Sequence, residues 1–125
     1  MGYRVTVTAR FEAAHNLIDY AGGPEPLHGH SYRVEAVLES EKLQQYDIAV
    51  DFVPVKKALE SIARELDYRY INEHPDFSGR NTSAENLARW FAEKLSASGT
   101  LGWSSVAAVT VWEGPENSAT YSPAH

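Results

Sequence analysis

The chain has 125 residues, of which 43% are hydrophobic and 22% are charged, a composition that favours one globular domain and argues against a disordered or fibrous protein. Seventeen acidic and eleven basic residues give a formal net charge of −6, the wrong sign for a general nucleic-acid or anionic-membrane binder. Cysteine is absent, so disulfides, thiolate zinc ligands and a cysteine nucleophile are excluded.

The first two predicted elements are strands. Apolar and polar side chains alternate over residues 5–15, which is the period of a half-buried strand. A bulge at Ala13-Ala14 is an alternative to an unbroken strand. Residues 16–26 contain two glycines and two prolines and predict a loop. The alternation returns over residues 28–38 and predicts a second strand, antiparallel to the first.

Two helices follow the strands. Pro54 suits the first turn of a helix, and the apolar positions after it recur at helical spacing, so we expect a helix from Val53 to about Leu66. Residues 72–81 predict a loop. Thr82 and Glu85 then have the form of a capping box, and the apolar positions that follow predict a second helix.

Two further strands complete the predicted order. Residues 106–113 are rich in β-branched side chains, and residues 119–122 can pair with them after a turn at residues 114–117. The order strand, strand, helix, helix, strand, strand is an α+β pattern, for which we expect a four-stranded antiparallel sheet with two helices on one face. The other face and both sheet edges need cover, so we also expect a homo-oligomer.

The apolar runs of the sequence bear on where in the cell the protein is expected. None approaches the ~20 residues of a membrane helix. Charged side chains at Arg4, Arg10 and Glu12 interrupt the region where a secretory signal needs an apolar stretch. We therefore expect a cytoplasmic protein with no membrane or nucleic-acid partner, and a single domain over residues 1–125.

Three of the five histidines are candidate metal ligands. His28 and His30 are two residues apart in a predicted strand, so their side chains point to the same side about 7 Å apart. His15 ends the neighbouring strand and completes a three-nitrogen set, which leaves the fourth tetrahedral position of a zinc ion open, as in catalytic sites. The alternative is three ordinary polar residues on a sheet face. For His74 and His125 we expect solvated surface histidines.

Six segments, in order along nearly the whole chain, carry a resemblance to a known family. They are Phe11-Glu12-Ala13-Ala14-His15, Leu27-His28-Gly29-His30-Ser31-Tyr32, Val50-Asp51-Phe52, Leu66-Asp67, Ser83-Ala84-Glu85-Asn86, and Val111-Trp112-Glu113 with Tyr121. Together they resemble the 6-pyruvoyltetrahydropterin synthase and 6-carboxytetrahydropterin synthase family. The resemblance implies the tunnelling fold, in which three subunits close a twelve-stranded barrel and two rings stack into a hexamer. It also implies a trimer or hexamer with sites between subunits.

The resemblance also implies residue roles. His15, His28 and His30 are expected to hold Zn2+ beside the side chain of a dihydropterin substrate. Glu113 matches the glutamate that anchors the pterin ring through its guanidine-like edge. Without the resemblance, Glu113 is interpreted as a solvated residue at a strand end. Thr82 and Ser83 are candidate substrate contacts, although helix capping already explains both.

The residues for proton transfer depart from the family pattern. The best-known members have a cysteine base shortly before the His-Gly-His segment, and that position falls at Pro24. They also have an Asp-His pair, of which only Asp67 is present, followed by Tyr68. A tyrosine, with an ordinary pKa near ~10, is suited to act as a general acid rather than as a base at neutral pH. Asp67 and Tyr68 are therefore candidate proton-transfer residues.

Glu25 is the candidate replacement for the missing base. It lies three residues before His28, and a partly desolvated carboxylate near zinc can take a hydroxyl proton in a retro-aldol cleavage. A subset of the family resembles this, using glutamate to cleave dihydroneopterin-type substrates to 6-hydroxymethyldihydropterin for folate synthesis. The alternative interpretation of Glu25 is a solvated loop residue between two prolines.

Three functions remain open from the sequence. The leading one is a zinc-dependent lyase of the 6-pyruvoyl- or 6-carboxytetrahydropterin synthase type, acting on the side chain of dihydroneopterin triphosphate or a related dihydropterin. The second is the glutamate-based cleavage, and the third is a pterin- or purine-binding protein without catalysis. A triphosphate substrate needs basic side chains to bind it. The candidates are scattered over strand, helix and loops: Arg33, Lys56, Lys57, Arg69 and Arg80.

Overall fold

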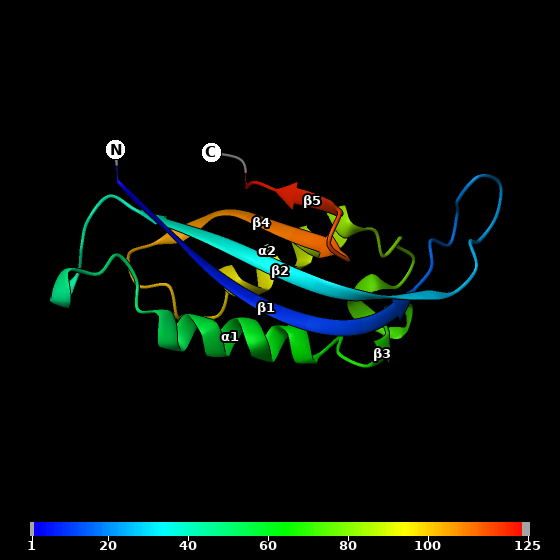
Figure 1. Cartoon of the computed structure of the whole chain (residues 1–125), viewed down its shortest axis with the longest axis horizontal. Helices are drawn as coiled ribbons and strands as arrows, with labels where there is room; N and C mark the ends of the chain where they lie inside the picture. Colours follow the sequence, from blue (N-terminus) through cyan, green and yellow to red (C-terminus); the bar gives the residue numbers. More distant parts are fainter. Residues whose placement is uncertain (1, 124–125) are drawn as a thin grey trace.

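The computed structural model describes residues 2–123, which form a five-stranded sheet with two helices packed on one of its faces (Figure 1). The sheet order is β3-β1-β2-β4-β5. The strands are β1 (Tyr3–His15), β2 (His28–Ser40), β3 (Arg69–Tyr70), β4 (Ser105–Glu113) and β5 (Asn117–Tyr121). The helices are α1 (Phe52–Arg64) and α2 (Ala84–Ser96), with short 3-10 helices η1 (Gln45–Asp47), η2 (Ile71–Glu73) and η3 (Pro75–Phe77). The predicted α+β class is confirmed, and the six predicted elements occur in the predicted order.

The long β1–β2 pair is the frame of the molecule. Its register runs without interruption from Tyr3 opposite Ser40 to His15 opposite His28, so the predicted alternative of a bulge at Ala13-Ala14 is wrong. Every second side chain of β1 from Val7 onward is buried, because successive side chains of a strand point to opposite faces. The same alternation carries His15 onto the buried face at the end of the strand.

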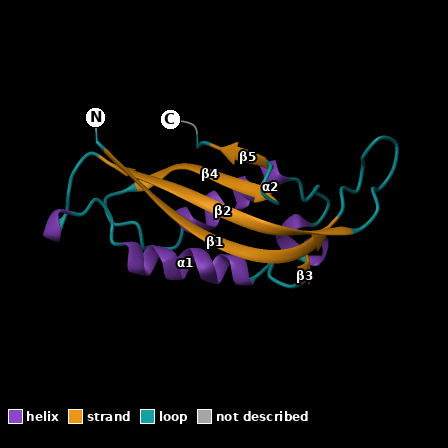
Figure 2. Cartoon of the chain, in the orientation of Figure 1, coloured by secondary structure: helices purple, strands orange, loops and turns teal. Residues whose placement is uncertain are grey.

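A fifth strand was not predicted from the sequence. Arg69 and Tyr70 pair in parallel with Ala13 and Ala14 of β1, so the sheet is mixed rather than purely antiparallel. Two residues are too few to produce a period in the sequence. The consequence is that the segment after α1 lies beside the end of β1 that carries His15 (Figure 2).

Each helix begins at a side-chain cap. The Asp51 carboxylate accepts a hydrogen bond from the Val53 amide at 3.0 Å, and α1 begins at the next residue, Phe52. The cap of α2 is Ser83, whose Oγ accepts from the Asn86 amide at 3.2 Å. The predicted cap at Thr82 is therefore wrong by one residue. Both helices are amphipathic and bury their apolar sides against the sheet.

The core lies between the sheet and the helices. Phe11 stacks on Tyr32 with ring centroids 4.7 Å apart, and Phe91 of α2 packs against Phe11 at 5.6 Å. The Tyr32 ring of this group packs against the rings of His15 and His30, so the core supports the histidines directly. Within residues 2–123, no helix is long and apolar enough to cross a membrane.

Candidate metal and catalytic site

The three predicted histidines meet at one end of the β1–β2 pair. His15 and His28 face each other across the two strands, and His30 follows on the same face of β2. Each ring offers one nitrogen, and these three nitrogens lie within 4.8 Å of one another. The Nε2 atoms of His15 and His28 are 3.1 Å apart. The loop that joins β1 to β2 projects beyond this end of the sheet (Figure 1).

The Nδ1 atoms of His15 and His28 have hydrogen-bond partners that suit a cation-binding site. Nδ1 of His15 lies 2.7 Å from the carbonyl oxygen of Thr82, and Nδ1 of His28 lies 2.9 Å from that of Pro26. A carbonyl oxygen only accepts, so each Nδ1 carries a proton, and in the neutral ring Nε2 then presents a lone pair. Carbonyl bonds of this kind orient metal-binding imidazoles. The donor set therefore fits a zinc ion.

The surroundings of His30 favour its neutral form. Burial lowers the pKa of His30, and the neighbouring histidines lower it further, while the Glu113 carboxylate opposes the shift. Next to it, Tyr32 is buried and its hydroxyl has no hydrogen-bond partner among the described residues. Burial raises the pKa of Tyr32, so this hydroxyl stays protonated.

Two carboxylates border the histidines. Glu113, at the end of β4, lies opposite Tyr32 in the sheet, and its Oε2 is 3.6 Å from Nε2 of His15. Glu25 comes from the β1–β2 loop, and its Oε1 is 3.9 Å from Nε2 of His28. The structure thus brings together five of the residues predicted for the site, from three strands and one loop.

Glu25 is held in place by its own loop. The Leu17 amide donates to Oε1 of Glu25 at 2.9 Å, and the Glu25 amide donates to the Leu17 carbonyl at 3.0 Å. Its side chain is 20% exposed. The interpretation of Glu25 as a freely solvated loop residue is therefore wrong, since both its backbone and its carboxylate have fixed partners.

Thr82 and Ser83 are occupied by structural contacts. Thr82 is fully buried and lies behind His15, whose Nδ1 is also 3.2 Å from the Thr82 hydroxyl. That hydroxyl donates to Oδ1 of Asn72 at 2.9 Å. Ser83 caps α2. That either residue contacts a substrate stays a prediction. The support that Thr82 gives to His15 was missed, because no periodicity marks a contact between residues this far apart in the chain.

Asp67 and Tyr68 lie at the outer edge of β1. Oδ1 of Asp67 accepts from the Glu12 amide at 2.8 Å, and the Tyr68 amide donates to the Glu12 carbonyl at 2.5 Å. The Tyr68 residue is 84% exposed. None of the hydrogen bonds or ion pairs among residues 2–123 joins either one to the three histidines. Their part in proton transfer stays a prediction.

His74 is not the solvated surface histidine that the sequence predicts. Its Nε2 lies 2.9 Å from Oε1 of Glu65, its Nδ1 accepts from the Asp76 amide at 3.1 Å, and its ring packs against Trp90. The side chain is only 17% exposed. The same expectation for His125 lies outside the described residues.

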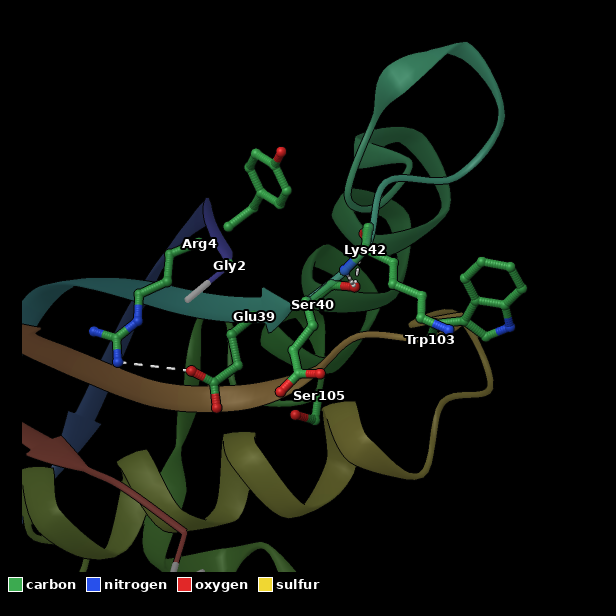
Figure 3. A pocket seen from close by; sticks show the side chains of 9 residues that line it. Gly2, Arg4, Glu39, Ser40, Lys42, Trp103 and Ser105 are labelled. Carbon is green, nitrogen blue, oxygen red and sulfur yellow. Dashed lines mark hydrogen bonds and ion pairs between the residues drawn. The ribbon is translucent and has the colours of Figure 1, made fainter.

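Two of the five predicted cations, Arg33 and Lys56, have partners other than the histidines. Arg33 pairs with Glu35 at 2.9 Å and lies over the ring of Trp112, while Lys56 donates to the Thr8 carbonyl. A surface hollow of about 760 Å³ lies at the opposite end of β1. Arg4, Lys42 and Trp103 are among its lining residues, and none of the predicted site residues is (Figure 3).

Comparisons with known proteins bear on the site as a whole. Residues 4–124 match the family model of 6-pyruvoyl tetrahydropterin synthase. The chain is 33% identical over 116 residues to a dihydroneopterin monophosphate aldolase of Pyrococcus furiosus, covering 93% of this chain and 94% of the relative. It is 28% identical to a 6-carboxy-5,6,7,8-tetrahydropterin synthase of Aquifex aeolicus, covering 97% and 98%.

Solved structures show the same fold. A 6-pyruvoyl tetrahydropterin synthase of Caenorhabditis elegans superposes with a TM-score of 0.83 at 21% identity, covering 99% of this chain and 97% of that one. A 6-pyruvoyltetrahydropterin synthase of Plasmodium vivax, described as a catalytic-residue mutant in which a glutamate is replaced by alanine, superposes with a TM-score of 0.80 at 21% identity, covering 97% of both chains.

Proposed function

Since the chain belongs to the 6-pyruvoyl tetrahydropterin synthase family, which acts on pterin side chains, we propose that it is a zinc-dependent lyase that cleaves a dihydroneopterin-type substrate. The bond to be broken joins the first two side-chain carbons, and the pterin product is 6-hydroxymethyldihydropterin. One observation favours cleavage over the synthase reaction. In a chain without cysteine, the Glu25 carboxylate is fixed 3.9 Å from Nε2 of His28.

The metal ligands in this proposal are His15, His28 and His30. The carbonyl partners of the His15 and His28 rings support the assignment, because they leave both Nε2 lone pairs free for an ion. A zinc ion held by these residues would make the hydroxyl protons of a polyol easier to remove. Glu25 lies in the loop next to the strand ends that carry the three histidines. In this proposal the base is therefore beside the hydroxyls of the bound substrate.

Glu25 is the general base. Its carboxylate takes the proton of the second side-chain hydroxyl, and the bond between the first and second carbons breaks as that oxygen becomes a carbonyl. The electron pair of the broken bond moves into the C=N bond of the dihydropterin ring. A proton returned to the first carbon completes 6-hydroxymethyldihydropterin, and the released fragment is glycolaldehyde or its phosphate.

Glu113 is the pterin anchor. A carboxylate accepts two parallel hydrogen bonds from a guanidine-like edge, and the Glu113 side chain is 25% exposed at the end of β4. Its Oε2 lies 3.6 Å from Nε2 of His15, so Glu113 borders the histidines. Thr82 lies behind His15 at the start of α2, and Thr82 and Ser83 stay candidate substrate contacts.

The names of the relatives cover both reactions. The Pyrococcus furiosus relative, at 33% identity, is named as an aldolase, which supports the cleavage. The Aquifex aeolicus relative is named as a 6-carboxytetrahydropterin synthase, which makes that reaction the second candidate. The lack of cysteine disfavours it in this chain.

The assembly we propose is a homo-oligomer, a trimer or hexamer, with sites between subunits. Beyond Ala13 and Ala14, the outer edge of β1 has no strand partner within residues 2–123, and β5 is the opposite edge of the sheet. Two such edges suit pairing with further copies. Asp67 and Tyr68, which lie at the β1 edge, would then serve the site of a neighbouring subunit.

The test of the base is Glu25→Gln, assayed by the rate at which 6-hydroxymethyldihydropterin forms. The amide keeps the shape of the side chain and its bond from Leu17 but cannot take a proton, so we expect turnover to fall by at least ~100-fold with zinc content unchanged. Glu12→Gln is the matched control, since Glu12 bonds to Ser31 on the other face of the strands. Full turnover in Glu25→Gln would remove Glu25 as the base.

A further inference from the structure

The loop that carries Glu25 is held by hydrogen bonds rather than by packing. Its large apolar side chains are exposed, Ile18 by 45%, Tyr20 by 58% and Leu27 by 60%. A segment with so few buried apolar contacts opens easily unless polar bonds tie it down. The bonds that tie it near Glu25 come from the two residues that directly follow His15.

Asn16 is the central residue of these bonds. Its Nδ2 donates to the carbonyl oxygen of Glu25 at 3.1 Å, and its Oδ1 accepts from the Tyr70 hydroxyl at 2.5 Å. One amide side chain therefore connects the loop to β3. The neighbouring Leu17 amide adds the bond to the Glu25 carboxylate.

The backbone of Asn16 is fixed by a second asparagine. Oδ1 of Asn72 accepts from the Asn16 amide at 3.3 Å, and Nδ2 of Asn72 donates to the Asn16 carbonyl at 2.8 Å. Oδ1 of Asn72 also accepts from the Thr82 hydroxyl, and Thr82 in turn holds the His15 ring. A continuous set of bonds thus runs from a metal-binding ring to the candidate base.

We propose that Asn16 is a positioning residue, which sets the place of Glu25 relative to the histidines through its bonds to Glu25 and Tyr70. The inference rests on the proposed function, because it needs Glu25 to be the base. A displacement of about 1 Å at a reacting group lowers a rate by up to ~100-fold. Asn16 acts on the reaction only through Glu25 and does not touch the substrate.

The test uses the full-length, zinc-loaded protein and two variants. Asn16→Ala removes both side-chain bonds, and we expect kcat to fall by about 10- to 100-fold with KM within about 3-fold and zinc per chain unchanged. Tyr70→Phe removes only the bond to Oδ1 of Asn16, so its loss in kcat is smaller. Asn81→Ala is the matched control, because Asn81 accepts from the Ile18 amide in the same loop but does not bond to Glu25. We expect its kcat to stay near that of the parent protein.

A double variant separates positioning from a general structural effect. In the Glu25→Gln background, whose residual rate is measured over long incubations, Asn16→Ala is expected to lower kcat no further, because the base it places is gone. A loss as large as in the parent background would overturn the inference. An equal loss in Asn81→Ala would also overturn it, since any anchor of the loop would then act alike.

Amide hydrogen exchange gives a readout without turnover. In Asn16→Ala the Leu17 and Glu25 amides, which bond within the loop, are expected to exchange faster, whereas amides in the middle of β1 are unchanged. Unchanged exchange together with unchanged kcat in Asn16→Ala would refute the inference while leaving the base intact. Failure of the proposed function itself has a different signature, namely full turnover in Glu25→Gln.

Discussion

His15 and His28 face each other through their Nε2 atoms. The two Nε2 atoms are 3.1 Å apart, and the other nitrogen of each ring is bonded to a carbonyl oxygen. In neutral rings these two atoms would present lone pairs that repel at this distance, so a cation between them would stabilise the folded chain. The unfolded chain does not hold these rings together, so an ion bound there would favour the native state.

Zinc addition should consequently raise the melting temperature. At a free zinc concentration a hundred times the dissociation constant, binding to the native state alone stabilises it by about 2.7 kcal/mol. His28→Ala and His30→Ala are expected to lose both stoichiometric zinc and this rise, as followed by metal analysis and thermal unfolding. His74→Ala is the control, because His74 bonds to Glu65 away from the three histidines. Full zinc content in both His28→Ala and His30→Ala would contradict the assignment.

At the residue scale, the sequence predicts the three clustered histidines but not the residues that support them. His28 and His30 are recognisable because a strand places alternate residues on one face, and His15 because it ends the neighbouring strand. Asn16 and Thr82 carry no such pattern. Their structural role depends on hydrogen bonds to residues distant in the chain. These bonds form only once β3 and the start of α2 are packed beside β1.

At the level of elements, α2 is tied to η3 by a charged cluster. The Asp76 carboxylate accepts a hydrogen bond from Nε1 of Trp90 at 2.9 Å and lies 3.5 Å from Nζ of Lys94 and 3.9 Å from Nδ1 of His74. The bond from Trp90, more than any other contact, lowers the pKa of Asp76 below its ordinary value of 3.8.

This shift predicts a pH-dependent contribution to stability. Because the folded-state pKa of Asp76 lies below the unfolded value, the contribution is complete above the unfolded pKa and is lost as the pH falls through the folded pKa. Asp76→Asn keeps an acceptor for Trp90 but removes the charge. Denaturant unfolding should show it less stable than the parent near neutral pH, with the difference shrinking below pH 3.8. A difference that is the same at both pH values would contradict this role.

The elements themselves were largely predictable. The two long strands and both amphipathic helices bury one side each, so their sequences repeat with the period of the structure. β3 was not predictable, since its two residues owe their conformation to pairing with Ala13 and Ala14. The start of α2 was misplaced by one residue because Thr82 and Ser83 are both good caps, and Thr82 is used elsewhere.

For the whole molecule, the proposed assembly explains where Asp67 lies. It sits at the edge of β1, bonded to Glu12, while Glu25 sits in the loop beyond the strand end. If each site takes Glu25 from one chain and Asp67 from another, the oligomer has a mass three or six times the 13.9 kDa of one chain. In such an oligomer, a variant that lacks Glu25 and a variant that lacks Asp67 can complement each other.

Mixing Glu25→Gln with Asp67→Asn tests this arrangement. Asn at position 67 keeps an oxygen for the Glu12 amide but loses the charge, so each variant alone is expected to be inactive and folded. In randomly mixed oligomers about a quarter of the sites combine an intact Glu25 with an intact Asp67 from another chain, so about a quarter of the activity should return. No recovery in co-expressed mixtures would show that each site is contained within one chain.

The most direct measurement of the central claim is the identity of the product. Zinc-loaded protein is offered dihydroneopterin, its monophosphate and its triphosphate in parallel, and the pterin products are identified by mass spectrometry. The placement of Glu25 beside His28 predicts 6-hydroxymethyldihydropterin with glycolaldehyde or its phosphate, lost in Glu25→Gln. A 6-carboxy- or 6-pyruvoyl-tetrahydropterin product, or a bound pterin that is never converted, would contradict it.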